Sequence, residues 1–213
     1  RSLQSCQRGA KNERWRKAIR ELESDKIFED SEIIRLIDIS DKEVLVDEAG
    51  ELFGKLSSGH KIVLLTITRL VETVEERSLV LLDEPESHLH PPLLSAFIRA
   101  LSNLLIQRNA VAIVATHSPV VLQEVPQSCV WKLLRTGFNA RVERLETESF
   151  GENVGILTRE VFGLEVTYSG FHKLIANEVA KLDEYDDILE SFNNEMGLEA
   201  KSIARALLNE KQG

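Results

Sequence analysis

The middle of the chain alternates between short aliphatic runs and longer stretches in which apolar residues recur every three or four positions. Residues 78 to 82 and 110 to 115 are continuous apolar runs of the kind that form buried strands. Between them, Pro91 and Pro92 begin a helix-like pattern that continues to about residue 108, since proline is tolerated in the first turn of a helix. This order predicts a βαβ unit whose two parallel strands are covered on both faces.

The N-terminal pattern predicts two helices separated by two short strands. Residues 8 to 28 carry an apolar stripe at helical spacing, surrounded by arginine and lysine residues. Residues 33 to 39 and 43 to 46 have the composition of short strands. An amphipathic stretch from residue 61 to about residue 76 predicts the second helix, which opens at the polar residues just before it.

The C-terminal third predicts a hairpin followed by helices. Residues 129 to 134 and 141 to 145 have strand composition, and residues 136 to 139 suit the turn between them. Residues 153 to 162 and the long stretch from residue 169 to residue 208 are predicted to be helical.

Composition and charge are those of an ordinary globular domain. The 213 residues contain 26 Lys and Arg against 35 Asp and Glu, which gives a formal net charge of −9. An acidic chain is not expected to coat nucleic acid over a broad face. The cations of residues 8 to 28 fit either a solvated helix face or a local patch that contacts phosphate or a partner.

The sequence predicts a cytoplasmic protein with no membrane partner. Its longest apolar runs are too short to span a bilayer, and its first residues show no signal-peptide pattern. Cys6 and Cys129 lie far apart and have no metal-ligand spacing, which favours a reducing compartment over a disulfide scaffold.

Two carboxylates follow the first predicted strand directly. Asp83 and Glu84 stand at its C-terminal end, which is where open α/β sheets bind their ligands. The first carboxylate at such a place can hold Mg²⁺ through its water shell, and the second can orient or deprotonate a water. Many strands end in acidic loops, so this pair alone indicates little.

A histidine ends the next strand. His117 follows residues 110 to 115 by two positions, and parallel neighbours would bring it to the same sheet edge as the two carboxylates. A histidine there can donate to a terminal phosphate while near neutral. Alone, it could equally cap the following helix.

A third polar segment opens the helix predicted from residue 61. Ser57, Ser58 and Gly59 combine a good N-cap with a residue that lets the backbone approach a ligand closely. The exposed N–H groups of a helix start can bind an anion, although a plain capped helix has the same pattern. His88 and His90 lie near the carboxylates, but the sequence places no cysteine or third histidine to complete a metal site.

The order of these three segments resembles the ABC-type ATPase superfamily. The run Asp-Glu-Pro-Glu-Ser-His-Leu-His-Pro at residues 83 to 91 is similar to the soluble branch that includes RecF-like and overcoming-lysogenization-defect ATPases. Transporter subunits more often carry aspartate where this chain has His90. Residues 52 to 61 and 115 to 126 further resemble the ATPase component of Septu-type antiphage systems, which also occurs beside certain retrons; the resemblance covers roughly residues 50 to 172.

The resemblance implies an α/β fold, the C-terminal portion of an ABC-type ATPase head with a mostly parallel sheet flanked by helices and a helical C-terminal extension. It divides the chain into a basic helix and connecting segment over residues 1–40, an ATPase lobe over residues 41–165 and the extension over residues 166–213. A composition shift near residues 163 to 170 marks the second boundary.

The resemblance also implies ATP and Mg²⁺ as cofactors. Asp83 would hold Mg²⁺ through water, Glu84 would be the general base for the attacking water, and His117 would sense the γ-phosphate. The site would be complete only in a head-to-tail dimer or a higher even-numbered oligomer. The signature residues that would contact the γ-phosphate of a partner subunit's ATP are Ser57, Ser58 and Gly59.

The same resemblance implies an antiphage ATPase that controls an HNH-type nuclease and, in retron-linked systems, works with a reverse transcriptase and its RNA–DNA product. One alternative is a DNA-repair or maintenance ATPase of RecF or SMC-head type, although the chain has no long heptads. A Toprim-fused nuclease would need an Asp-x-Asp pair at a strand end, whereas the acidic residues 181 to 187 follow a helical, solvated pattern. A non-catalytic scaffold would dock through an apolar face between Phe171 and Val179, which could equally be core.

The phosphate-binding loop G-x-x-x-x-G-K-[ST] does not occur in these residues. Residues 50 to 57 come near it, but they have three residues between the glycines and a leucine after the lysine. The superfamily carries this loop well before the signature. We therefore expect the chain to be the C-terminal part of a longer ATPase and to bind ATP poorly alone.

Overall fold

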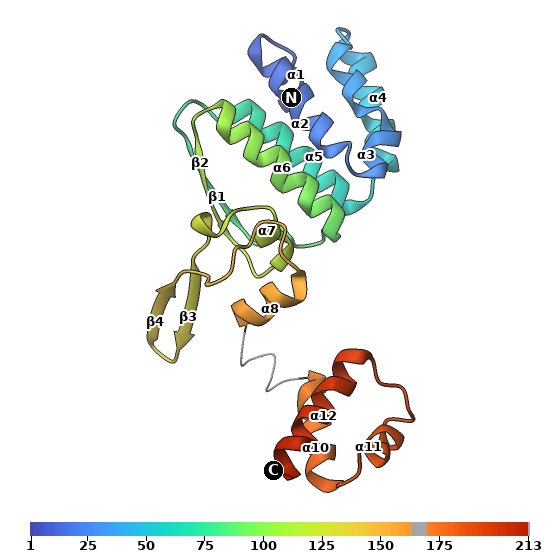
Figure 1. Cartoon of the computed structure of the whole chain (residues 1–213). Helices are drawn as coiled ribbons and strands as arrows, with labels where there is room; N and C mark the ends of the chain where they lie inside the picture. Colours follow the sequence, from blue (N-terminus) through green and yellow to red (C-terminus); the bar gives the residue numbers. More distant parts are fainter. Residues whose placement is uncertain (163–169, 213) are drawn as a thin grey trace. The chain divides into compact units, whose positions relative to one another are not determined.

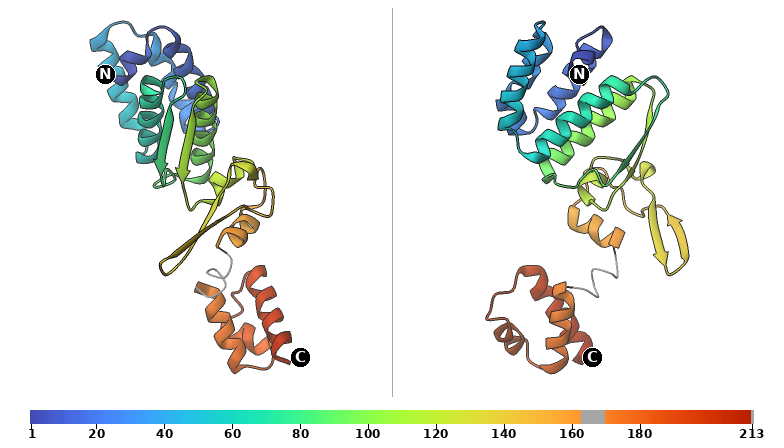
Figure 2. Two further views of the ribbon diagram at one scale, coloured as in Figure 1. Left: turned by 90° about the vertical axis from the view of Figure 1, so that its left-hand side faces the viewer. Right: turned by 180° about the vertical axis from the view of Figure 1, so that it is seen from behind.

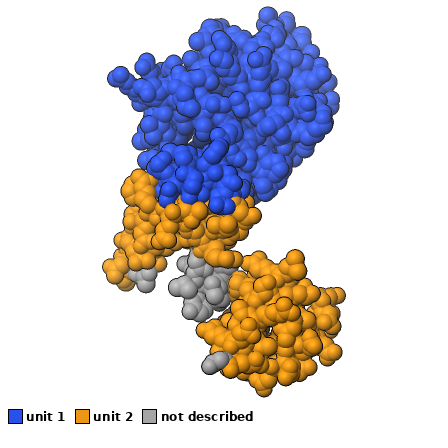
Figure 3. Space-filling view, in the orientation of Figure 1, with its two compact units in different colours: residues 1–130, 148–152 blue, residues 131–147, 153–213 orange. Residues whose placement is uncertain are grey.

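The computed structural model describes residues 1–162 and 170–212 as helices and two small sheets (Figure 1). They form two compact units, unit 1 with residues 1–130 and 148–152, and unit 2 with residues 131–147 and 153–213 (Figure 3). These units differ from the three segments expected from the sequence, whose boundaries stay predictions.

Unit 1 contains a βαβ unit. Its elements are, in chain order, α1 (Ser2–Cys6), α2 (Ala10–Leu22), α3 (Lys26–Ser31), the 3₁₀ helix η1 (Ile33–Asp38), α4 (Lys42–Lys55), α5 (Ser58–Thr73), β1 (Leu79–Asp83), α6 (Pro91–Gln107), β2 (Val111–Ala115), α7 (Pro119–Gln123) and the 3₁₀ helix η2 (Gln127–Cys129). β1 and β2 pair in parallel, with Leu79 opposite Val111 and Asp83 opposite Ala115, and α6 is the crossover. The predicted α/β class and βαβ unit are therefore confirmed.

The helix predicted over residues 8 to 28 is two helices, α2 and α3, separated by a turn at Asp25. The Oδ1 atom of Asp25 accepts hydrogen bonds from the backbone N–H groups of Ile27 at 3.0 Å and Phe28 at 3.4 Å. This cap satisfies N–H groups that the first turn of a helix leaves unpaired. The apolar spacing continues across the turn, which is why the pattern predicted one helix.

The two short strands predicted over residues 33 to 39 and 43 to 46 are wrong, because both segments are helical. The buried side chains of η1 stand three and four positions apart, which is helical spacing. Asp41 begins α4 by accepting hydrogen bonds from two backbone N–H groups of its first turn. Isoleucine and valine favour strands, but in these two segments the helical spacing of the buried residues and the cap at Asp41 favour helices instead.

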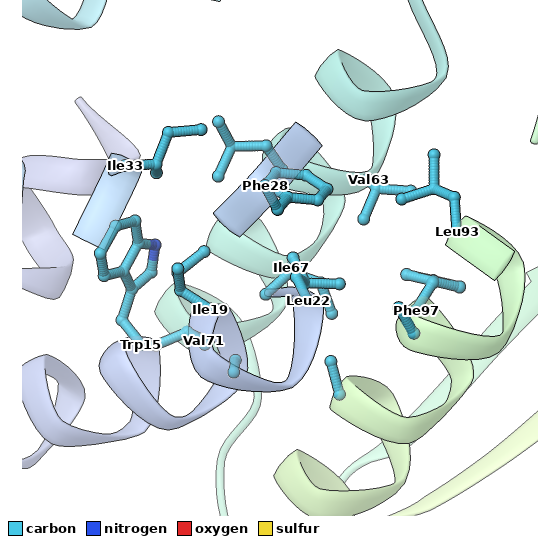
Figure 4. Packing of buried hydrophobic residues seen from close by; sticks show 14 of the residues in the cluster. Trp15, Ile19, Leu22, Phe28, Ile33, Val63, Ile67, Val71, Leu93 and Phe97 are labelled. Carbon is cyan, nitrogen blue, oxygen red and sulfur yellow. The ribbon is translucent and has the colours of Figure 1, made fainter. Parts of the chain in front are cut away.

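The core of unit 1 lies between packed helices (Figure 4). Trp15 and Leu22 of α2, Ile67 of α5 and Phe97 of α6 belong to this core, and all four side chains are buried. The indole Nε1–H of Trp15 donates a 3.0 Å hydrogen bond to the hydroxyl of Thr68. That bond matters because a buried donor without an acceptor is costly.

One face of the β1–β2 sheet is covered by helices, and the other is bare in the described part of the chain. Val80 is 9% exposed, whereas Leu81 and Ile113 are 69% and 59% exposed. The left view of Figure 2 looks onto the bare face, with α5 and α6 behind the strands. The expectation of cover on both faces is therefore wrong for the described residues, because the helices that flank β1 in sequence lie on one side.

Unit 2 confirms the predicted hairpin and C-terminal helices. Its elements are β3 (Lys132–Thr136) and β4 (Asn139–Glu143), which are antiparallel, then α8 (Val154–Phe162), α10 (Gly170–Lys181), α11 (Tyr185–Ser191) and α12 (Leu198–Gln212). Ile175 and Val179 are buried in the small core of α10, α11 and α12, whereas Phe171 and Leu174 are 46% and 58% exposed. The apolar face predicted on this helix is thus partly core.

The remaining predictions for the C-terminal part concern a boundary and acidic residues. Nearly all of the predicted boundary at residues 163 to 170 lies outside the described residues. Asp183, Asp186 and Asp187 are solvent-accessible rather than part of the core, as expected of a solvated acidic segment. Across the described residues, no helix is both long and apolar enough to cross a membrane.

Replacing Thr68 with valine should lower the free energy of unfolding by about 1–3 kcal/mol, because the buried N–H of Trp15 loses its acceptor at nearly constant volume. Urea unfolding of the chain measures this. Thr73→Val on the same helix is the matched control, since the exposed Thr73 lies where water can replace its contacts. Equal losses in the two variants would contradict the importance of the Trp15–Thr68 bond.

Candidate functional site

The two carboxylates and the histidine predicted from the sequence come together at one end of the parallel sheet. Asp83 ends β1 opposite Ala115, the last residue of β2. The backbone N–H of Glu84 donates to the carbonyl oxygen of Ala115 at 2.9 Å. His117 Nδ1 lies 3.6 Å from Glu84 Oε1. This edge is the C-terminal end of the strands, where open α/β sheets bind ligands.

Glu84 has an unusual backbone conformation. Its φ is +43°, in the left-handed region that L-residues other than asparagine and aspartate rarely adopt. Its side chain is 58% exposed, so packing of the carboxylate does not explain the conformation. Such residues cost about 1–3 kcal/mol and gather at functional sites.

Glu86 is a member of this site that the sequence analysis missed. Its side chain is 8% exposed, and its Oε1 accepts hydrogen bonds from the hydroxyl of Thr116 at 2.7 Å and the backbone N–H of His117 at 2.8 Å. The same oxygen lies 3.2 Å from His117 Nδ1. Glu86 therefore ties the segment after β2 to the segment after β1 and positions His117.

Glu86 is held in its ionised form. Burial alone would raise the pKa of Glu86, but hydrogen bonds from Thr116 and from backbone N–H groups, together with the charge of His117, bring the pKa below its usual value. Its second oxygen, Oε2, is buried and makes no hydrogen bond within the described residues. An ionised oxygen in that position is a spare acceptor beside the strand ends.

The three signature residues begin α5. Ser57 caps this helix, since its Oγ accepts from the backbone N–H of His60 at 3.4 Å. Ser57 and Ser58 are exposed and Gly59 is buried. The first turn itself contains no acidic residue, and negative charge is favoured at the positive end of a helix dipole. This is the arrangement expected of an anion site, and the role of the three residues in binding ATP stays a prediction.

Gly59 connects the signature to the segment that follows β1. A Cβ atom at Gly59 would lie 2.7 Å from the carbonyl oxygen of His88 and 3.3 Å from Leu89 Cδ2. The φ of Gly59 is not positive, so its backbone conformation does not require glycine. Glycine is needed here because a side chain would prevent the close approach of the His88 carbonyl. The segment from Glu84 to His90 therefore runs from the strand ends to the start of α5.

A second polar cluster contains His90, which the sequence analysis considered as a metal ligand only beside His88. His60 is 1% exposed, and its Nε2 lies 2.9 Å from Asp25 Oδ1. His90 Nε2 lies 3.5 Å from Asp25 Oδ2. Burial would raise the pKa of Asp25, but hydrogen bonds from His60 and the α3 backbone lower it overall. Thirty-five positions separate Asp25 from His60, so no local pattern pointed to the cluster.

Several cations of α2 are engaged inside unit 1. Arg16 forms a salt bridge with Asp38, and Lys17 Nζ lies 3.2 Å from Glu13 Oε1. Lys11 Nζ donates a 2.7 Å hydrogen bond to the carbonyl oxygen of Glu72. These contacts give the three residues a structural role, and the two alternatives for the other cations of this segment stay predictions.

Comparison with known proteins gives two findings. A family model described as "AAA domain, putative AbiEii toxin, Type IV TA system" matches residues 8–123, a segment that holds the signature, both parallel strands and His117. The chain is also similar to Protein ea59 of Escherichia phage lambda, with 49% identity over 214 residues that cover 93% of this chain and 41% of that protein. The chain thus spans about two fifths of that relative's length.

Replacing Gly59 with alanine should lower the free energy of unfolding by about 1–3 kcal/mol, because the new methyl group meets a backbone oxygen at 2.7 Å. Gly54→Ala is the matched control, since Gly54 lies within α4 and its new methyl group would have no neighbouring atom within 4 Å. That variant should be more stable by about 0.5–1 kcal/mol. Urea unfolding measures both, and a Gly59→Ala chain as stable as the original would refute the close approach.

Proposed function

The chain belongs to the AAA-domain family described as "putative AbiEii toxin, Type IV TA system", and from that premise we propose that it forms the hydrolytic part of an ATPase. One observation carries the proposal, namely the convergence of Asp83, Glu84 and His117 at the C-terminal end of a parallel strand pair. This is the placement at which a nucleotide's terminal phosphate and its metal ion are handled in α/β ATPases.

The residues at this edge fit Mg²⁺ and a phosphate. Asp83 and Glu84 have solvent-accessible carboxylates at the end of β1, and carboxylate oxygens are ligands that Mg²⁺ prefers. In the proposal, Asp83 holds the ion through water, and the ion's part is to neutralise charge on the phosphate oxygens. Glu84 orients the attacking water and takes its proton.

His117 is placed to act on the γ-phosphate with one ring nitrogen. Its Nδ1 faces Glu84 and Glu86 at 3.6 and 3.2 Å, and a proton on that atom would be shared with the carboxylates. This leaves Nε2 for the phosphate. Glu86 acts through His117 and is a positioning residue in this scheme.

The signature residues have a separate role in the proposal. Ser57, Ser58 and Gly59 present a helix start to ATP held by a second subunit, in a head-to-tail dimer or a higher even-numbered oligomer. The exposure of the two serines and the absence of acidic residues in the first turn of α5 support this role. Charge stabilisation and positioning would supply most of the catalysis.

The finer proposal is an antiphage ATPase of the Septu type that controls an HNH-type nuclease, with a reverse transcriptase and its RNA–DNA product as further partners in retron-linked systems. Its support is the motif similarity over residues 52 to 61 and 115 to 126. A non-catalytic, nucleotide-gated scaffold is the second candidate. The observation that favours it is the exposure of Phe171 and Leu174 on α10, at 46% and 58%, which offers apolar surface to a partner.

Replacing Glu84 with glutamine in the natural protein that carries this chain should lower ATP turnover by about 10²–10⁴-fold, because the amide cannot accept the proton of water. ATP binding should be retained, since the exposed side chain keeps its shape. Phosphate release and nucleotide retention measure the two effects.

Glu76→Gln is the control for that experiment, because Glu76 is exposed and lies before β1, at the opposite end of the strand. It should turn over ATP at the original rate. Unchanged turnover in Glu84→Gln would remove Glu84 as the base. A natural protein that binds ATP, assembles on binding and never hydrolyses it would favour the scaffold.

A further inference from the structure

We propose that Asp25, His60 and His90 form a binding site for a divalent transition-metal ion, with Zn²⁺ as the representative ion. The three residues come from separate parts of unit 1. Asp25 precedes α3, His60 lies in the first turn of α5, and His90 precedes α6. An ion held by all three would join three helix starts at one point.

The distances fit a single small ion. His60 Nε2 and His90 Nε2 lie 2.9 and 3.5 Å from the two carboxylate oxygens of Asp25, and one ligand atom from each residue lies within 4.8 Å of the others. Bonds of about 2.0 Å in a tetrahedron put neighbouring ligand atoms about 3.3 Å apart. The two separations end on different oxygens of Asp25 and lie on both sides of that value, so the ion would replace the hydrogen bond between His60 Nε2 and Oδ1 and draw the three side chains together.

The donor set selects the class of ion. Two imidazole nitrogens and one carboxylate are ligands for Zn²⁺ and its neighbours Co²⁺ and Ni²⁺, whereas Mg²⁺ prefers oxygen ligands throughout. The cluster is therefore chemically distinct from the carboxylate pair at Asp83 and Glu84, which suits Mg²⁺. The two sites would not compete for one ion.

Burial gives the cluster a closed side and an open side. Asp25 and His60 are 6% and 1% exposed, whereas the side chain of His90 is 48% exposed. An ion can enter past His90 and keep a fourth position for water or another ligand.

The two carboxylate oxygens of Asp25 have different partners. Oδ1 accepts the hydrogen bonds from Ile27 and Phe28 that begin α3. Oδ2 faces His90 at 3.5 Å, beyond an ordinary hydrogen-bond length. Oδ2 can therefore bind an ion without disturbing the cap.

The surroundings of His60 are those of a metal ligand. Its Nδ1 lies 2.6 Å from the hydroxyl oxygen of Ser57, so an ion on Nε2 would fix the ring proton on Nδ1, where it donates to Ser57. Metal-binding histidines almost always have such an outer partner. His90 Nδ1 accepts a weak 3.4 Å bond from the backbone N–H of Leu93; an ion on Nε2 would put the ring proton on Nδ1 and end that bond.

Cobalt titration of the full chain tests the site, because Co²⁺ reports its coordination through visible d–d absorption. The expected result is one Co²⁺ per chain with a tetrahedral band that equimolar Zn²⁺ removes and excess Mg²⁺ does not. Zn²⁺ should also raise the Tm of the chain.

His90→Asn is the decisive variant, since asparagine still caps α6 but lacks the imidazole. Its Co²⁺ affinity should fall more than about 100-fold, because even outer partners change metal affinity by about 10–100-fold. Asp25→Asn, which keeps an oxygen for the α3 cap, should lose affinity similarly. Circular dichroism checks that both variants remain folded.

His88→Asn is the matched control, the same substitution two positions away on an exposed residue whose positive φ suits asparagine. It should bind Co²⁺ as the original chain does, and so should Glu84→Gln, which separates this site from the proposed ATPase edge. A chain with no tetrahedral Co²⁺ band, or a band that persists in His90→Asn, would overturn the proposal.

Discussion

The buried carboxylate of Asp25 is the contact on which the arrangement of unit 1 depends. It caps α3, accepts from His60 at the start of α5 and faces His90 at the start of α6. A buried charge is tolerated only when it is paired and hydrogen-bonded. The three helix starts must therefore reach their places together, and the start of α5 is also the signature segment.

The segment between β1 and α6 links that contact to the strand ends. Glu84 and Glu86 at its beginning face His117, the carbonyl of His88 lies against Gly59, and His90 at its end meets Asp25. A shift of this short segment would move the carboxylate edge and the signature together. Rigid support of this kind is what a phosphate-handling site requires, because small misplacements are costly in positioning.

Local patterns in the sequence predicted the elements that carry the site. The βαβ unit, the helix after Ser57 and the meeting of Glu84 with His117 follow from apolar runs, prolines and strand parallelism. The helical segments over residues 33 to 46 did not follow, because their isoleucine and valine content favours strands and the deciding cap at Asp41 is a single residue. Tertiary contacts were out of reach, since nothing local in the sequence shows that Glu86 is buried or that Asp25 meets His60.

The backbone conformation of Glu84 is unfavourable for folding, whereas the proposed chemistry needs a carboxylate at this position. A left-handed φ of +43° suits glycine or asparagine better than glutamate. Glycine at this position should relieve the conformational energy while removing the carboxylate on which the proposed chemistry rests. Selection for stability alone would therefore tend to remove glutamate from residue 84, whereas the role proposed for its carboxylate would retain it.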